Sequence, residues 1–178
     1  PLNFEMASTD EMVNFAIENL PYACCIVPEK RDELTTEGGL NLIENKSILK
    51  NILKLKKAGI SCSLFLDPDI NQIKIASELG VDAIEIHTGK YCDALDVDEI
   101  QTELEKIKVS AKYAKSVGLD VHAGHGLNYQ NVGEIAKIIE ITELNIGHFI
   151  IGEAIFSGIE IAIKKMRKII NDARVNSL

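Results

Sequence analysis

Histidines at the ends of apolar segments are the first chemical feature of this sequence. All four, His87, His122, His125 and His148, lie at or just after the end of an apolar run that is typical of a β-strand. Imidazole is the side chain most easily poised between its neutral and charged forms at cellular pH. If the runs are parallel strands, their carboxyl ends share one edge of a sheet, where α/β enzymes place their chemistry. The pattern predicts proton-transfer chemistry at that edge.

Two glutamates also occupy apolar strand-like runs. Glu5 and Glu85 each stand between two hydrophobic residues. A carboxylate in such a position is costly unless it is paired or hydrogen-bonded, and burial raises its pKa toward the range that suits a general base. For either residue alone, a solvated edge position or a structural ion pair explains the pattern equally well. Two such residues near strand ends favour a functional interpretation.

The segment 122–126, His-Ala-Gly-His-Gly, is the densest cluster of these residues. Its glycines permit a tight turn and a close approach of the backbone to a ligand. His125 falls just beyond the strand, where it can act as an acid or a base, although a histidine packed under a loop is the alternative. We assign His122 a packing or supporting role. Three residues apart in an extended strand, the two histidines point to opposite faces, so we expect no metal.

Two further segments suit a phosphorylated ligand. Asn145-Ile146-Gly147-His148 stands before a helix start, and glycine followed by helix N-terminal amides is a common phosphate site in late barrel strands. Thr35-Thr36-Glu37-Gly38-Gly39 is a polar loop after a strand. It is either a lid over a substrate or a solvated turn beside the charged residues 30–33.

Strands and helices alternate along the chain, which is typical of right-handed βαβ units and a parallel sheet. Apolar patterning and capping residues predict strands at 2–6, 23–27, 60–66, 81–86, 119–123 and 144–147. They predict helices that follow the capping residues 8–11, span 48–55, 70–79, 99–117 and 132–139, and close the chain at 154–173, with 89–98 as loop.

Two α/β architectures fit this alternation. A doubly wound open sheet suits the length, whereas a (β/α)8 TIM barrel needs about 250 residues and this chain supplies six units. No dinucleotide-type glycine fingerprint follows the first strand, which weakens the nucleotide-binding version of the open sheet. The chain also opens directly in a strand, as if in the middle of a fold. We expect residues 1–178 to form one domain.

Composition narrows the class of protein. With 19 Lys and Arg against 27 Asp and Glu, the net charge of -8 argues against a non-specific nucleic-acid binder. The apolar runs are far shorter than the ~20 residues of a membrane helix, and no signal peptide is visible. Cys24, Cys25, Cys62 and Cys92 form no CxxC pair, so we expect them to pack as small hydrophobes in a reducing cytoplasm.

Taken together, six segments in order resemble the pyridoxine 5′-phosphate synthase family of vitamin B6 biosynthesis. They are Asn3-Phe4-Glu5-Met6-Ala7, residues 27–31 with 35–39, Ser63-Leu64-Phe65-Leu66-Asp67, Glu85-Ile86-His87-Thr88-Gly89, Ala123-Gly124-His125-Gly126-Leu127 and Glu143-Leu144-Asn145-Ile146-Gly147-His148. The resemblance implies a (β/α)8 barrel assembled as a homo-octamer. It implies condensation of 3-amino-2-oxopropyl phosphate with 1-deoxy-D-xylulose 5-phosphate to pyridoxine 5′-phosphate, inorganic phosphate and water, without a metal or organic cofactor.

The resemblance also implies roles for single residues. Glu5 is similar to the family's proton-accepting glutamate, His125 to its proton-donating histidine, and Glu85 to a further active-site glutamate. The ligand-holding positions follow in the same way: Thr35 for the deoxyxylulose phosphate, and Gly126, Gly147 and His148 for the amino-ketone phosphate.

One departure from the family is large. Family members begin with two further strands that add an aspartate, histidines and arginines to the site, and nothing here corresponds to them. The six expected strands are then the third to eighth of the barrel, and residues 1–178 its C-terminal three-quarters, within a longer protein. Two rival functions remain: a non-catalytic module that binds a phosphorylated metabolite, and another phosphate-handling barrel enzyme.

Overall fold

The computed structural model describes residues 1–28, 38–43 and 48–175. Six parallel strands form one sheet whose spatial order follows the sequence, β1-β2-β3-β4-β5-β6. The strands are β1 (Asn3–Ala7), β2 (Ala23–Val27), β3 (Ser61–Leu66), β4 (Ala83–His87), β5 (Asp120–Gly124) and β6 (Ile141–Asn145). A sheet without a reversal of strand order has no switch point, so the doubly wound alternative is wrong.

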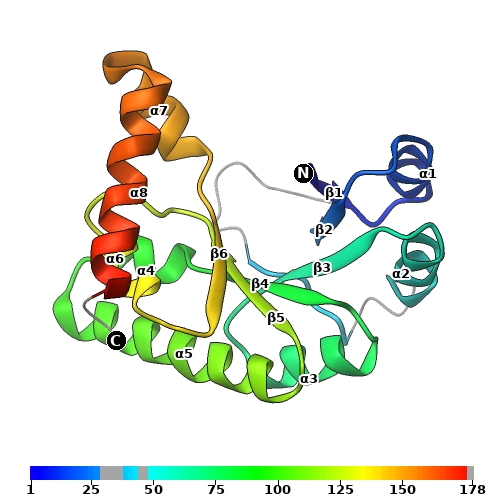
Figure 1. Ribbon diagram of the computed structural model, residues 1–178. Helices are drawn as coiled ribbons and strands as arrows, with labels where there is room; N and C mark the ends of the chain where they lie inside the picture. The colour runs from blue at the N-terminus through cyan, green and yellow to red at the C-terminus, as the bar shows by residue number, and fades with distance from the viewer. Residues whose placement is uncertain (29–37, 44–47, 176–178) are drawn as a thin grey trace.

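Most of the helices lie on the outer side of the sheet, and the sheet and helices together make a half-barrel (Figure 1). They are α1 (Asp10–Asn19), α2 (Ile48–Lys57), α3 (Ile70–Glu78), α4 (Gly89–Asp93), α5 (Val97–Ser116), α6 (Val132–Ala136), α7 (His148–Ser157) and α8 (Ile159–Val175). The prediction of an α/β fold with parallel strands and outer helices is confirmed.

Capping side chains set the starts of three helices. Thr9, Asp69 and Asp96 each accept a hydrogen bond from an amide in the first turn of α1, α3 and α5, respectively. Such a cap satisfies one of the amides that an α-helix leaves unpaired at its start. Just after α3 and α5, Gly80 and Gly118 adopt positive φ angles of 72° and 87°, as expected for residues that end a helix.

Alternation along the strands gives the sheet two different faces. One set of side chains packs under the helices in a single large aliphatic core, which includes Ile26, Leu64, Ile84 and Val121. The intervening residues point to the concave face, where Cys25, Val27 and Phe65 make a second, small buried cluster. The concave face is therefore where polar side chains of the strands can gather.

Three local predictions differ from the structure. Segment 89–98 is not all loop, because α4 occupies Gly89–Asp93. The closing helix predicted at 154–173 is two helices, α7 and α8, separated at Gly158, whose φ is 85°. The last strand begins at Ile141 rather than 144, because an apolar run adjoining a helix start gave no clear boundary. Among the described helices, none has the length and apolar character needed to cross a membrane.

Candidate active site

A cavity of about 650 Å³ opens at the carboxyl ends of the strands, on the concave side of the sheet. Six predicted site residues line it: Glu5, Glu85, His125, Gly126, Gly147 and His148. The other lining residues are Val27, Phe65, Leu127, Asn128, Asn145, Ile146 and Phe149. Thr35 lies outside the described residues, as does most of the predicted lid 35–39. The strand edge thus brings together residues separated by more than a hundred positions in the chain.

Glu85 is the most deeply buried carboxylate of the cavity, with only 4% of its surface exposed. Its Oε2 accepts hydrogen bonds from Asn145 Nδ2 at 2.7 Å and from Cys25 Sγ at 3.5 Å. Burial raises the pKa of Glu85 to about 7, the Asn145 amide opposes this, and the charge of Glu5 adds to it. A carboxyl group in this state can both give and take a proton near neutral pH.

Two of the partners of Glu85 were not predicted. Asn145 was assigned to the phosphate segment, and its contact with β4 depends on pairing across β5, which one strand alone does not reveal. Cys25 was expected only to pack, but it faces Glu85, and burial raises its pKa well above the usual value, so it stays a thiol donor. The sequence did carry a signal for this contact: alternate residues of β2 face opposite sides of the sheet, so Cys25 points away from Cys24 and toward the concave face.

Gly124 makes room for the Glu85 carboxyl group. A Cβ atom at this position would lie 2.3 Å from Glu85 Oε1 and 2.9 Å from the carbonyl oxygen of Asn145. Only glycine allows β5 to run this close beneath the carboxylate. The glycines beside His125 were predicted to let the backbone approach a ligand. At Gly124 the backbone instead approaches the Glu85 side chain.

A β-bulge between β5 and β6 decides which β6 residues face the cavity. Val121 pairs with Ile141, but His122 pairs with Glu143, so Thr142 is the extra residue of β6. Such a bulge changes the direction of the side chains that follow it. It brings Glu143 and Asn145 to the concave face.

His125 follows β5 in a left-handed conformation, with φ of 82°. This region is uncommon for residues other than glycine. Its carbonyl oxygen accepts hydrogen bonds from Thr88 Oγ1 at 2.5 Å and from Cys92 Sγ at 3.5 Å. After this turn, His125 is part of the lining of the cavity.

His87 is a neighbour of His125 that the predicted site left out. It is 3% exposed, its ring centroid lies 4.8 Å from that of His125, and its Nδ1 lies 3.0 Å from Asp67 Oδ1. This hydrogen bond lowers the pKa of Asp67, with a smaller contribution from the Gly39 amide. The position of His87 at a strand end was noted from the sequence, but its partner Asp67, just after β3, was not.

Glu5 and His122 differ in their surroundings. Glu5 is exposed on β1, opposite Cys25 in the strand register, so its carboxylate reaches the cavity from the first strand. His122 Nδ1 lies 3.7 Å from Glu143 Oε1 and is not among the cavity residues. This location agrees with a supporting role for His122. Across the described residues, no cluster of three or more histidine, cysteine or acidic side chains could hold a metal.

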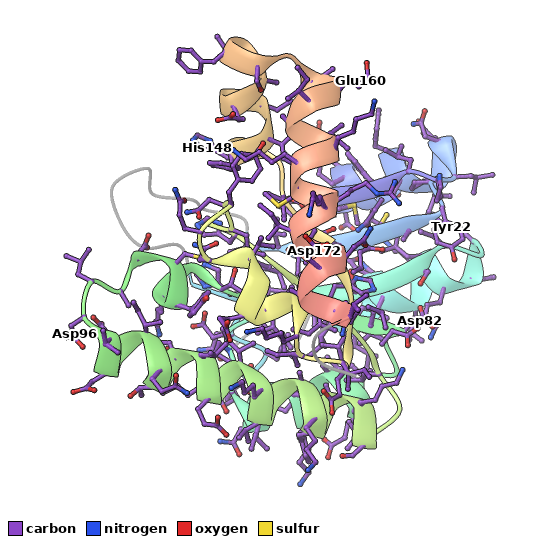
Figure 2. All side chains as sticks on the ribbon, turned by 60° about the vertical axis from the view of Figure 1, so that its left-hand side comes forward. Tyr22, Asp82, Asp96, His148, Glu160 and Asp172 are labelled. Atoms are coloured by element: carbon purple, nitrogen blue, oxygen red, sulfur yellow. The ribbon has the colours of Figure 1, made fainter. Side chains whose placement is uncertain are left out.

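The far end of the cavity is shaped by the start of α7. Gly147 is the N-cap, His148 is the first helical residue (Figure 2), and no acidic residue occupies the first turn. The backbone amides and dipole at this helix start suit an anion. Gly126, with φ of 78°, packs so tightly that a Cβ would lie 2.7 Å from Cys92 Cβ. The missing side chain of Gly126 thus makes room for Cys92, and the start of α7 is the feature of this end of the cavity that suits an anion.

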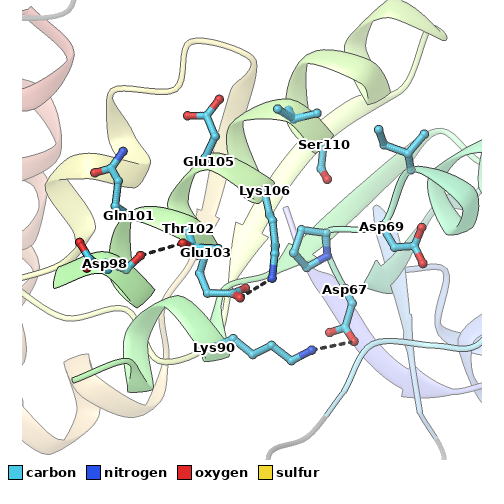
Figure 3. A pocket seen from close by; sticks show the side chains of 13 residues that line it. Asp67, Asp69, Lys90, Asp98, Gln101, Thr102, Glu103, Glu105, Lys106 and Ser110 are labelled. Carbon is cyan, nitrogen blue, oxygen red and sulfur yellow. Dashed lines mark hydrogen bonds and ion pairs between the residues drawn. The ribbon is translucent and has the colours of Figure 1, made fainter. Parts of the chain in front are cut away.

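A second, larger cavity of about 1060 Å³ lies outside the sheet, between the Asp67–Ile70 segment and α5 (Figure 3). Each of its two lysines is paired with a carboxylate of the groove: Lys106 with Glu103 at 2.6 Å and Lys90 with Asp67 at 4.0 Å. The lining of this groove contains no histidine and neither Glu5 nor Glu85. Size therefore does not identify the site here, because the smaller cavity is the one that the predicted site residues line.

Comparison with known families agrees with this geometry. The profile of the family described as "Pyridoxal phosphate biosynthesis protein PdxJ" matches residues 1–172. Curated relatives named pyridoxine 5′-phosphate synthase include those of Sulfurihydrogenibium sp., 57% identical over 98% of this chain and 72% of the relative, and of Zymomonas mobilis, 53% identical over 98% and 68%.

Solved structures with low sequence identity share the fold alone. The HpcH/HpaI aldolase of Desulfitobacterium hafniense superposes with a TM-score of 0.57 at 9% identity, over 96% of this chain and 73% of that chain. The Amycolatopsis orientalis BexX/CysO complex gives a TM-score of 0.57 at 12% identity, over 92% and 60%.

Proposed function

The chain belongs to the family of the pyridoxal phosphate biosynthesis protein PdxJ, and from this premise we propose that its concave cavity is a pyridoxine 5′-phosphate synthase site. The reaction condenses 3-amino-2-oxopropyl phosphate with 1-deoxy-D-xylulose 5-phosphate to give pyridoxine 5′-phosphate, inorganic phosphate and water. The observation that carries the proposal is the convergence of Glu5, Glu85 and His125 on one cavity beside the start of α7.

Proton transfer is the task that this set of side chains suits. Formation of an imine between the amine and the ketone, the dehydrations and the loss of phosphate each require a proton to move near neutral pH. In this proposal Glu5 accepts a proton and His125 donates one to a departing oxygen. Glu85, with a pKa of about 7, exchanges protons or stabilises the charged intermediates between them.

The substrate phosphates are assigned to the backbone. Gly147 and His148 offer amides at the positive end of α7, and Gly126 offers the close approach of a left-handed turn. Backbone donors favour a dianion without a nearby basic side chain, which fits a chain of net charge -8. The role of Thr35 in holding the deoxyxylulose phosphate stays a prediction.

We further propose that the six strands are the third to eighth of a (β/α)8 barrel and that residues 1–178 are a single domain, its C-terminal three-quarters. The chain covers 72% and 68% of the length of the first two curated relatives, which supports a chain of about three-quarters of the barrel. Assembly as a homo-octamer and a location in the cytoplasm are likewise predictions from the family.

The decisive experiment mixes the purified full-length protein with the two phosphorylated substrates. Pyridoxine 5′-phosphate is measured by chromatography and inorganic phosphate by a coupled assay, and equal rates of appearance are expected. A non-catalytic binding module would bind a substrate in calorimetry yet release no phosphate. Phosphate release without pyridoxine 5′-phosphate would instead indicate another phosphate-handling enzyme, and either result would reject the proposal.

A further inference from the structure

The conformation of His125 requires an explanation that the proposed proton transfers do not supply. Its φ of 82° places a histidine in the left-handed region. Such a conformation persists only where surrounding contacts hold it. The hydrogen-bond donors to its carbonyl oxygen come from one short segment: Thr88, just after β4, and Cys92, within α4.

Thr88 is the centre of that segment. Its amide donates to the carbonyl oxygen of Gly124 at 2.9 Å, and its Oγ1 lies 2.8 Å from the same oxygen and 2.5 Å from that of His125. Thr88 has no exposed surface. One hydroxyl group therefore bridges the last two carbonyl groups of the turn that presents the imidazole.

His87 holds the ring as Thr88 holds the backbone. Its ring packs edge-on against His125 at 4.8 Å and against Phe65 at 5.0 Å, so it contacts two residues that line the cavity. The Asp67 carboxylate can only accept a hydrogen bond, so His87 carries its proton on Nδ1. Nε2 is buried and has no hydrogen-bond partner among the described residues.

Gly89 completes the arrangement. A Cβ atom there would lie 2.6 Å from His87 Nε2 and 3.2 Å from His125 Cδ2. The absent side chain lets both imidazoles stand against the backbone of α4. Asp67, His87, Thr88 and Gly89 thus form a continuous support beneath His125.

We propose that Thr88 and the Asp67–His87 pair are positioning residues for His125, Thr88 fixing its left-handed backbone and His87 the orientation of its ring. This inference rests on the proposed function, because it gives the proton donor of that reaction its geometry. Neither residue transfers a proton to substrate. Their effect is on how often the His125 imidazole stands in the productive orientation, which appears in kcat more than in KM.

The first test compares Thr88→Val, which keeps the shape and removes the hydroxyl, with Thr88→Ser, which restores it. We expect Thr88→Val to lower kcat by about 10-fold to 10²-fold with KM within about twofold of wild type, and Thr88→Ser to recover most of the loss. Thr102→Val is the matched control, because the Thr102 hydroxyl bonds a carbonyl on the exposed surface of α5. It should leave both constants unchanged.

Two outcomes would overturn the proposal for Thr88. One is an equal loss in Thr88→Val and Thr88→Ser, and the other is a lower thermal midpoint in Thr88→Val with kcat unchanged. A crystal structure of Thr88→Val adds a readout that needs no activity. His125 is expected to leave the left-handed region or to turn its ring, and an unchanged His125 would contradict the inference even if the wild type made no product.

The second test addresses His87 by imidazole ¹⁵N NMR of the full-length protein. The wild type should show Nδ1 protonated and Nε2 bare, and Asp67→Asn should weaken that preference. His87→Asn keeps a donor toward Asp67 but removes the ring, so it should lower kcat while KM stays near wild type. A wild-type His87 protonated on Nε2, or a His87→Asn protein with normal kcat, would remove His87 from this role. Failure of the wild type to make pyridoxine 5′-phosphate would instead reject the proposed function.

Discussion

The two faces of the sheet are built from the same strands but from different chemistry. Under the helices, consecutive strands contribute Ile26, Leu64, Ile84 and Val121, all fully buried. On the concave face, alternating positions of the same strands carry polar, ionisable or small residues. These are Glu5, Cys25, Ser63, Glu85, His87, His122, Gly124, Glu143 and Asn145.

Side chains that alternate along each strand therefore have different tasks: those on the outer face stabilise the fold, and those on the concave face include the predicted reactive groups. The interior of a (β/α)8 barrel is commonly filled by bulky branched side chains. Here the concave side has only a small apolar cluster, Cys25, Val27 and Phe65, and the large core is outside. A change on the outer face should therefore act on folding, and a change at a concave-face residue that lines the cavity should act mainly on turnover.

The largest effect expected is that of His125→Ala on turnover. A proton-transfer group typically contributes ~10²-fold to 10⁴-fold, so formation of pyridoxine 5′-phosphate should fall by about that factor while the thermal midpoint stays near wild type. His122→Ala is the comparison on the same strand, because His122 lies beside Glu143 and outside the cavity. Turnover and thermal unfolding of both variants decide the assignment. Near-normal turnover in His125→Ala would remove it from the mechanism, and a larger loss in His122→Ala would exchange the two roles.

The reverse effect is expected on the outer face. Leu64→Ala removes a side chain with no exposed surface, and such truncations cost about 2–5 kcal/mol of stability. Denaturant unfolding should show that loss, while kcat measured at a temperature where the variant is folded should match wild type. If kcat fell as steeply as stability, the division between the two faces would be too simple.

Glu85→Gln should alter stability in a pH-dependent manner. Burial raises the pKa of Glu85 from 4.5 to about 7, so the folded protein holds a proton that the unfolded chain releases. The resulting stabilisation is full below about pH 4.5 and is lost as pH rises through 7, a change of about 3 kcal/mol. The glutamine variant lacks this loss. Its free energy of unfolding should therefore fall less than that of wild type between pH 5 and pH 8, although turnover is reduced. Parallel curves for the two proteins would show that Glu85 is not protonated in this range.

The smallest expected effect tests the space beneath Glu85. Gly124→Ala places a Cβ where Glu85 Oε1 and the Asn145 carbonyl already lie, which should cost about 1–3 kcal/mol and displace the carboxylate. Gly152→Ala is the control, since nothing lies within 4 Å of its Cβ position in α7, and it should gain about 0.5–1 kcal/mol. Thermal unfolding compares the two. Equal tolerance at both glycines would mean that β5 and the carboxylate can move apart.

Much of the fold followed from the sequence because alternation and capping are local. Apolar residues on either side of Glu85 indicated a strand with one polar position facing the other way, and that residue is buried on β4. The gathering of Glu85, His125 and His148 at one edge followed from parallel strands alone. The assignment of roles still depends on the family and stays a prediction.

The features that were missed depend on contacts between strands. The partnership of Asp67 with His87 joins β3 to β4, and that of Asn145 with Glu85 crosses β5, so neither is written in a single segment. Segment 89–98 was taken as loop because α4 has only five residues and begins with Gly89. Short helices carry too few residues for periodicity to indicate them.

The extra residue Thr142 determines which side chains of β6 face the cavity. Because side-chain direction alternates with every residue, a regular pairing that placed Thr142 opposite His122 would put Glu143 on the same face as Ile141, toward the helices. Asn145 would then turn away from Glu85, and Leu144, which now packs against the core, would face the cavity. A one-residue gap at Thr142 in a homologous sequence would therefore remove the bulge yet keep Asn145 on the concave face, whereas a gap at Leu144 would turn Asn145 away from Glu85.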